Sequence, residues 1–327
     1  MKRFKNILYV AELSVNQDAA MARAVSLAEN NQAHLTITDV VPEQTAIMMT
    51  SQGSPSKTDL MKAAMAKRRA ELDALIVSHR SRLQPTIEVM AGTKFLEVIR
   101  AVLRHDYDLV IKPSENPDWI DRLFGSDDMH LLRKCPCPVW LMKPDEKANY
   151  ECIVAAVDFD PYGLNTDDTL LNEAILGLSS SLALSDFAAL HLVHAWEAPE
   201  AGFASLWSDN PDKTETKMIE GVRTHHTSQM DNLTRKLREQ IGADTYSYLS
   251  PRVHLPMGPA NTAIPTLVKQ LQADLVVMGT VARTGIPGFI IGNTAESILD
   301  QLTCSVLALK PPGFVSPVTL VGQASDG

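Results

Sequence analysis

The chain is poor in cysteine, has no excess of basic residues and contains no long hydrophobic run. Four cysteines occur in 327 residues and none forms a CxxC pair, so we expect neither a zinc site nor a dithiol redox centre. The net charge of -9 argues against a nucleic-acid partner, which would require basic residues to neutralise phosphates. No apolar run approaches the roughly 18 residues of a membrane span, and the N-terminal segment lacks the apolar core of a signal peptide. We therefore expect a cytoplasmic protein.

A long internal repeat is the main positive feature of the chain. The letters DLVIKP at residues 108–113 reappear as DLVVMG at residues 274–279, and each copy ends its last apolar run with Lys-Pro. Asp108 and Asp274 differ by 166 and Lys143 and Lys310 by 167, so one single-residue insertion explains the change in offset. A period of this length is far beyond the roughly 20 to 50 residues of solenoid repeats. It indicates a duplicated domain.

Each copy alternates short apolar runs with amphipathic segments. The first expected strands are residues 7–11 and 153–157, which end at the acids Glu12 and Asp158. The long expected helices are residues 57–83 and 215–241. Apolar strands that alternate with helices predict an open parallel sheet covered by helices on both faces. We therefore predict an α/β fold of two tandem open parallel sheets, with five strands each. The expected domains are residues 1–147 and 148–314, followed by a flexible tail at 315–327.

The second copy contains the best candidate for a ligand site. Ligands of open parallel sheets bind beyond the carboxyl ends of the strands, near the point where the strand order reverses. This rule selects Asp158, after the first strand, and the glycine-rich segment 279–296. Glycine lets backbone amides approach an anion, and a helix start presents unpaired N–H groups to it. A plainer interpretation stands beside this one, in which Asn293 caps a helix and forms a capping box with Glu296.

The strand end at Gly279, the acid Asp158 and the glycine-rich loop to Gly292 together resemble the universal stress protein family. The duplication is similar to the tandem, two-domain E type of that family. The resemblance implies Rossmann-like domains of the adenine nucleotide alpha hydrolase-like class, a role in stress response, and ATP or AMP as the ligand. Asp158 would meet the adenine or the ribose. The residues that the resemblance assigns to a nucleotide site are Asp158, Gly279, Thr280, Arg283, Gly292, Asn293 and Thr294.

Two positions of the second copy depart from the family pattern. Members with bound ATP carry G-x2-G-x9-G-[ST], and the four positions are here Gly279, Ala282, Gly292 and Asn293. Alanine replaces the middle glycine and asparagine the last hydroxyl, while Thr294 follows one residue late. An alanine where the backbone must approach a ligand closely costs on the order of 1 kcal/mol. We therefore expect weak binding of ATP or AMP, in the second domain only.

The matching loop of the first copy is unlike a phosphate site. Residues 112–118 contain prolines and carboxylates where a phosphate would require glycines. Glu115, Asp118, Asp127 and Asp128 would repel an anion. The first domain is therefore predicted to bind no nucleotide.

Aromatic residues gather in one segment of the second copy. They make up only 6% of the chain, yet Trp196, Phe203 and Trp207 lie within twelve positions of each other, and the counterpart around Met48 is also apolar. Such side chains either cover the adjacent helices or form an apolar ligand groove or a protein interface. A second hypothesis is therefore a non-nucleotide interaction module that binds a protein partner or an apolar ligand.

Catalytic and metal-binding patterns are weak. We find no GxSxG elbow and no activated nucleophile, so we do not expect an enzyme, and slow ATP hydrolysis that depends on Asp158 is a third hypothesis. His191 and His194 lack an identifiable third metal ligand, and the pair His225-His226 is expected to be solvated on a helix. The resemblance also implies that the last strands of the two copies pair, as in an intramolecular pseudo-dimer.

Overall fold

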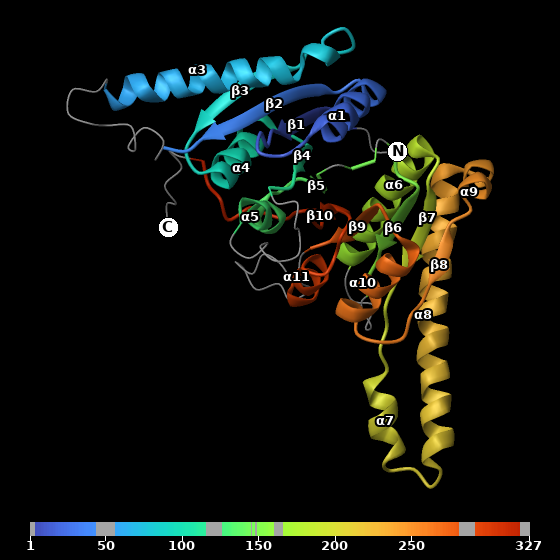
Figure 1. The fold of residues 1–327 in the computed structure, drawn as a ribbon. Helices are drawn as coiled ribbons and strands as arrows, with labels where there is room; N and C mark the ends of the chain where they lie inside the picture. The colour runs from blue at the N-terminus through green and yellow to red at the C-terminus, as the bar shows by residue number, and fades with distance from the viewer. Residues whose placement is uncertain are drawn as a thin grey trace. The chain divides into compact units, whose positions relative to one another are not determined.

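The computed structural model describes residues 4–43, 56–115, 126–144, 146–147, 149–159, 166–280 and 292–320. These residues form two compact units (Figure 1). The N-terminal unit contains the described residues up to 147, together with Thr280 and residues 305–320. The C-terminal unit contains the described residues from 149 to 279 and residues 292–304.

The N-terminal unit has a parallel sheet in the strand order β3-β2-β1-β4-β5. Strands β1 and β4 are almost entirely buried, because helices cover both faces of the sheet, as the apolar runs predict. Its described elements are β1 (Asn6–Val10), α1 (Asp18–Asn31), β2 (His34–Val41), α3 (Lys57–Leu75), a 3-10 turn (Val77–His79), β3 (Thr86–Ala91), α4 (Lys94–His105), β4 (Leu109–Pro113), α5 (Asp127–Lys134) and β5 (Val139–Met142).

Strand β10 (Ser305–Leu309) also belongs to the N-terminal unit, although it comes from the end of the second copy. It pairs antiparallel with β5, with Leu307 opposite Trp140. The Ser305 hydroxyl accepts a hydrogen bond from the backbone N–H of Lys143 at 2.8 Å. The last strands of the two copies therefore pair, as the sequence analysis expects. The pairing covers the edge of β5 that would otherwise be exposed.

The C-terminal unit has a parallel sheet in the strand order β9-β6-β7-β8. Helix α7 packs along the first part of the long helix α8, so the two form a hairpin (Figure 1). The described elements are β6 (Cys152–Ala156), α6 (Thr166–Asp186), β7 (Ala189–Val193), α7 (Pro199–Ser205), α8 (Pro211–Ile241), α9 (Ala243–Leu249), β8 (Arg252–His254), α10 (Ala260–Leu271), β9 (Leu275–Gly279) and α11 (Asn293–Leu299).

The repeated aspartate before each fourth strand has a structural role. The Asp108 carboxylate accepts hydrogen bonds from the backbone N–H groups of Lys5 and Asn6, at 2.7 and 3.1 Å. The Asp274 carboxylate likewise accepts from Glu151 and Cys152, at 2.7 and 2.9 Å. Each aspartate therefore ties the start of its fourth strand to the start of the first strand. This explains why both copies retain it.

The described part of the expected tail is attached to the N-terminal unit. The Ser316 hydroxyl donates to the backbone oxygen of Lys134 at 2.7 Å, and Arg100 donates to the backbone oxygen of Thr319 at 3.4 Å. Residues 321–327 lie outside the described part. Among the helices that the structure describes, none has both the length and the apolar character needed to cross a membrane.

Candidate functional site

The strand order reverses beside the first strand of each sheet. Strand β1 lies between β2 and β4, and β6 lies between β7 and β9. Glu12 and Asp158 follow these two strands. They therefore occupy the position at which an open α/β sheet binds ligands. The two acids have different neighbours, so the two units offer different chemistry at this position.

In the N-terminal unit, a buried charge cluster fills this position. The Lys112 side chain is fully buried at the end of β4. Its Nζ lies 2.7 Å from the Asp128 carboxylate, 3.2 Å from that of Glu115 and 3.6 Å from that of Glu12. Lys94 Nζ lies 2.7 Å from Glu12 on its other side. Three carboxylates and two ammonium groups thus form ion pairs with one another at the end of the sheet.

These neighbours set the protonation of the cluster. Burial alone would raise the pKa of Glu12, but Lys112 and Lys94 outweigh it and lower the pKa to about 2. Burial alone would lower the pKa of Lys112, but Asp128, Glu115 and Glu12 raise it above its usual value. Burial raises the pKa of Glu115, and Lys112 opposes part of that rise. The lysine and Glu12 therefore stay charged at neutral pH.

The expectation that Glu115 and Asp128 repel an anion did not take the positive charge of Lys112 into account. Both carboxylates neutralise this lysine, so they close the position by filling it with internal ion pairs. Asp127 lies in the first turn of α5, and Asp118 lies outside the described residues. Lys112 was detectable in the sequence, because the matching letter in the DLVVMG copy is methionine.

In the C-terminal unit, the acid at the same position faces solvent. The Asp158 side chain is 70% exposed, whereas that of Glu12 is 10% exposed. The buried Asn172 on α6 holds the Asp158 backbone: its side-chain oxygen accepts from the N–H at 3.1 Å, and its amide donates to the carbonyl at 2.6 Å. His194 Nδ1 lies 3.9 Å from the carboxylate. The Asp158 backbone is therefore fixed while its carboxylate remains accessible.

Gly279 ends β9 beside Asp158, since Ala156 of β6 pairs with Met278 of β9. A Cβ atom at Gly279 would lie 2.8 Å from Cδ2 of Leu171 on α6. The absence of a side chain therefore makes room for the helix. The structure brings Asp158 and Gly279 to one edge of the sheet.

Thr280 has a different environment. Its side chain is buried in the N-terminal unit, where its hydroxyl donates to the backbone oxygen of Leu132 at 3.4 Å and accepts from Lys310 Nζ. Its backbone N–H donates to Leu309 at 3.2 Å. The hydroxyl that the sequence analysis assigns to a nucleotide is thus already engaged. Arg283 lies outside the described residues.

The start of α11 corrects the expected helix cap. Gly292 is the N-cap, and Asn293 is the first helical residue, so the prediction that Asn293 caps the helix was wrong. Glycine is a tolerated N-cap residue, and the backbone oxygen of Gly292 accepts the first helical hydrogen bond, from Glu296 at 2.9 Å. Asn293 and Thr294 are therefore exposed on the first turn.

A pair of buried histidines, missed by the sequence analysis, lies behind Asp158. His194 Nε2 and His226 Nδ1 are 2.9 Å apart, and both side chains are buried. The expectation that His226 is solvated was therefore wrong. The sequence spacing of His226 indicates its burial, because His226 lies on the same helical stripe as the buried Met230 and Leu233 of α8.

A second pair joins His191 to His254, with Nδ1 and Nε2 2.8 Å apart. His191 and His194 thus contact different partners and do not converge on a common ligand. In the part of the chain that the structure describes, no group of three or more histidine, cysteine or acidic side chains is placed to hold a metal ion.

We expect the C-terminal unit to lose stability below about pH 6.5. Burial lowers the pKa of His191, His226 and His254, and neighbouring histidines or arginine lower it further. Because the unfolded chain then binds more protons than the folded one, stability is complete above the ordinary pKa and falls as pH drops below it. Each histidine contributes at most about 1.4 kcal/mol per pH unit.

Urea unfolding between roughly pH 8 and pH 5 measures this dependence. His226→Gln should reduce the slope more than His225→Gln, because His225 is exposed and acts only as a neighbouring charge that lowers the pKa of His226. Equal slopes in the wild-type chain and His226→Gln would contradict the assignment.

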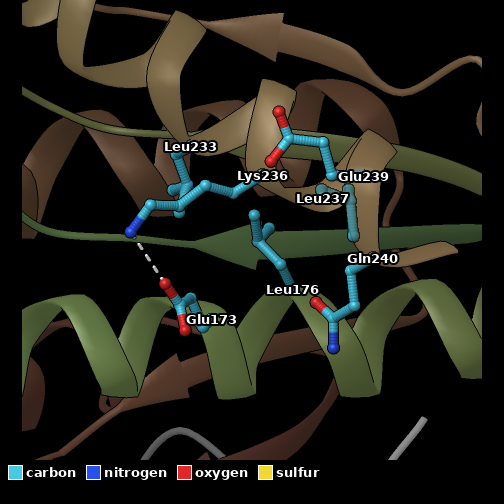
Figure 2. A pocket seen from close by; sticks show the side chains of 7 residues that line it. All are labelled: Glu173, Leu176, Leu233, Lys236, Leu237, Glu239 and Gln240. Atoms are coloured by element: carbon cyan, nitrogen blue, oxygen red, sulfur yellow. Dashed lines mark hydrogen bonds and ion pairs between the residues drawn. The ribbon is translucent and has the colours of Figure 1, made fainter.

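A pocket of about 480 Å³ lies between α6 and α8 (Figure 2). The buried Leu176 and Leu237 form its apolar part, and Lys236 reaches Glu173 at 2.9 Å across it. Its lining residues are Glu173, Leu176, Leu233, Lys236, Leu237, Glu239 and Gln240. Since its single cation is already paired with a carboxylate, this pocket is poorly suited to a phosphate.

Comparison with known proteins agrees with this architecture. The model of the universal stress protein family matches residues 3–143 and 149–310. Universal stress protein E of Escherichia coli (strain K12) is 28% identical over 337 residues, spanning 100% of both chains. The universal stress protein E homolog of Haemophilus influenzae is 28% identical over 324 residues, which span 94% of this chain and 98% of the relative.

Solved structures support the same conclusion. A putative universal stress protein from Pseudomonas aeruginosa UCBPP-PA14 has a TM-score of 0.64 and 26% identity, with 94% of each chain covered. A universal stress protein from Archaeoglobus fulgidus DSM 4304, at 16% identity and a TM-score of 0.61, shows the fold alone. The resemblance and the Rossmann-like α/β class inferred from the sequence are confirmed. The chain belongs to the universal stress protein family, as a tandem protein of the E type.

Proposed function

We propose that this chain is a stress-response protein whose C-terminal unit binds an adenine nucleotide, ATP or AMP, through Asp158. The observation that carries the proposal is the contrast between the two strand-end acids. Asp158 is 70% exposed at its switch point, whereas Glu12 is 10% exposed and ion-paired. Only the C-terminal unit therefore offers an accessible acid there, and the N-terminal unit binds no nucleotide.

The chemistry of Asp158 suits a nucleoside. Ribose hydroxyls and the adenine amino group are hydrogen-bond donors, and an ionised carboxylate accepts from them more strongly than a neutral group does. Because Asn172 fixes the Asp158 backbone, Asp158 itself needs little ordering when a ligand binds.

We expect the binding to be weak. The Thr280 hydroxyl is engaged within the N-terminal unit, and Ala282 replaces the glycine of the family pattern. Kd values on the order of 0.1 to 1 mM correspond to about 4 to 5.5 kcal/mol of binding free energy. Weak binding would let the occupancy follow the cellular nucleotide concentration.

Calorimetric titration with ATP and with AMP tests the proposal. We expect one site per chain, weakened about 10- to 100-fold in Asp158→Ala by the loss of a charge-assisted hydrogen bond. Asp209→Ala, which removes an exposed carboxylate elsewhere in the same unit, is the matched control. We also propose binding without turnover, so the same samples should release no phosphate.

Two results would contradict this assignment. Folded wild-type protein that gives no heat with either nucleotide, and releases none on denaturation, would remove nucleotide binding altogether. Binding that is unchanged in Asp158→Ala would place the site elsewhere.

A further inference from the structure

Helix α7, the turn after it and the start of α8 form a projecting element, residues 197–223, which we call the arm (Figure 1). A small core of its own supports it. Trp196, Ala198 and Ala201 are buried against partly buried apolar residues of α8 and against Leu255. The Trp196 indole N–H donates to the backbone oxygen of Leu255 at 3.0 Å. Helix α7 is therefore held in place on the C-terminal unit.

The turn of the arm is also ordered by local hydrogen bonds. The Ser208 and Thr214 hydroxyls are 2.6 Å apart, and the Asn210 side chain caps α8 by accepting from the N–H of Lys213 at 3.3 Å. Pro211 occupies the first turn of α8, where its fixed backbone favours the helix. A partner would therefore meet a preformed surface and would not have to order it.

Three large apolar side chains on this preformed element point away from its core. Phe203 is 69% exposed, Leu206 75% and Trp207 83%. Phe203 lies in α7, and Leu206 and Trp207 lie in the turn that directly follows the helix. Aromatic side chains of this kind dominate the energetics of protein interfaces once they are buried. We name these three residues the apolar face of the arm.

The arm carries more acids than bases, since residues 197–223 contain six acids and three basic residues, Lys213, Lys217 and Arg223, all of which follow residue 212. Residues 197–212 contain four acids and no lysine or arginine, and all four acids are exposed. They are Glu197, Glu200, Asp209 and Asp212. Such a surface repels an anionic membrane. In a two-fold contact with a second copy it would meet the same acids, in a chain whose net charge is already -9.

We propose that the arm is a docking element whose apolar face enters an apolar pocket, rimmed by lysine or arginine, on a different and basic protein. The acids steer the encounter and reject acidic surfaces, while the three apolar side chains supply the affinity. This interaction is independent of nucleotide binding, because it uses none of the residues around Asp158.

Fluorescence anisotropy with two labelled synthetic peptides tests the proposal on the intact chain. Both peptides are amphipathic helices with the same leucine face, and one carries lysine where the other carries glutamate. We expect the lysine peptide to bind and the glutamate peptide not to bind. Raising the salt from about 50 mM to about 300 mM should weaken the lysine complex several-fold.

Variants assign the binding to the arm. The double substitution Phe203→Ser with Trp207→Ser should weaken the lysine peptide by about 30-fold, as expected for the loss of interface hot spots. Phe187→Ser removes an aromatic side chain that is 80% exposed outside the arm, and it should change nothing. The double charge reversal Glu200→Lys with Asp209→Lys leaves two acids and two lysines in residues 197–212, so it should abolish the preference for the lysine peptide. Since all these side chains are exposed, urea unfolding checks that each variant folds.

Several outcomes would overturn the proposal. Equal binding of the lysine peptide by the wild-type chain and the Phe203/Trp207 variant would show that the arm is not the binding site. Equal binding of both peptides would show that the arm has no preference for a basic partner. Binding to phosphatidylcholine–phosphatidylglycerol vesicles, or light scattering that shows a dimer abolished by Trp207→Ser, would assign the face to a membrane or to a second copy.

Discussion

Replacing Lys112 with methionine should lower the free energy of unfolding by about 3 to 5 kcal/mol. Lys112 is fully buried among the carboxylates of Asp128, Glu115 and Glu12. Without Lys112 the three carboxylates stay in place but lose their main positive partner. Lys94 compensates mainly for Glu12, because it contacts Glu12 more closely than it contacts Glu115. Urea unfolding followed by circular dichroism measures the loss.

A double variant separates the charge from the packing. In the second copy, Met278 stands at the position equivalent to Lys112 and Ala295 at the position equivalent to Asp128. The double variant Lys112→Met with Asp128→Ala therefore gives the first copy the apolar pair of the second. Because removing both partners leaves less unpaired charge, it should recover more than half of the loss. A single-variant loss below about 1 kcal/mol, or a less stable double variant, would show that the cluster contributes little.

Replacing Trp196 with alanine should cost about 3 to 5 kcal/mol, whereas Trp207→Ala should change stability by less than about 0.5 kcal/mol. Trp196 is 5% exposed and anchors α7, while Trp207 is 83% exposed. The alanine would leave a cavity beneath the arm and would leave the backbone oxygen of Leu255 without its indole donor.

Urea unfolding measures both variants, and hydrogen exchange of residues 197–223 locates the effect. Faster exchange confined to the arm in Trp196→Ala would show that the small core holds α7 in place. Similar losses for the two tryptophans would contradict the division between an anchor and an exposed face.

The aromatic segment between Trp196 and Trp207 has two parts that its sequence does not distinguish. Two interpretations stood side by side, one of cover over adjacent helices and one of an interface. The structure divides them, since Trp196 covers α8 while Phe203 and Trp207 are exposed. Helical spacing alone could not decide this, because it does not show which stripe of a short helix meets a neighbour. The counterpart around Met48 lies outside the described residues.

The amino-acid sequence by itself determined the duplication, the alternation of strands and helices, and the position of Glu12 and Asp158 at the ends of first strands. Each depends on local periodicity or on the offset between copies, both of which are read along the chain. Only the tertiary structure decided that one acid is accessible and the other enclosed. Lys112 meets Glu12 from one hundred residues away in sequence, and His194 likewise meets His226 on a distant helix. Such pairings follow from how helices and strands pack, which local patterns do not encode.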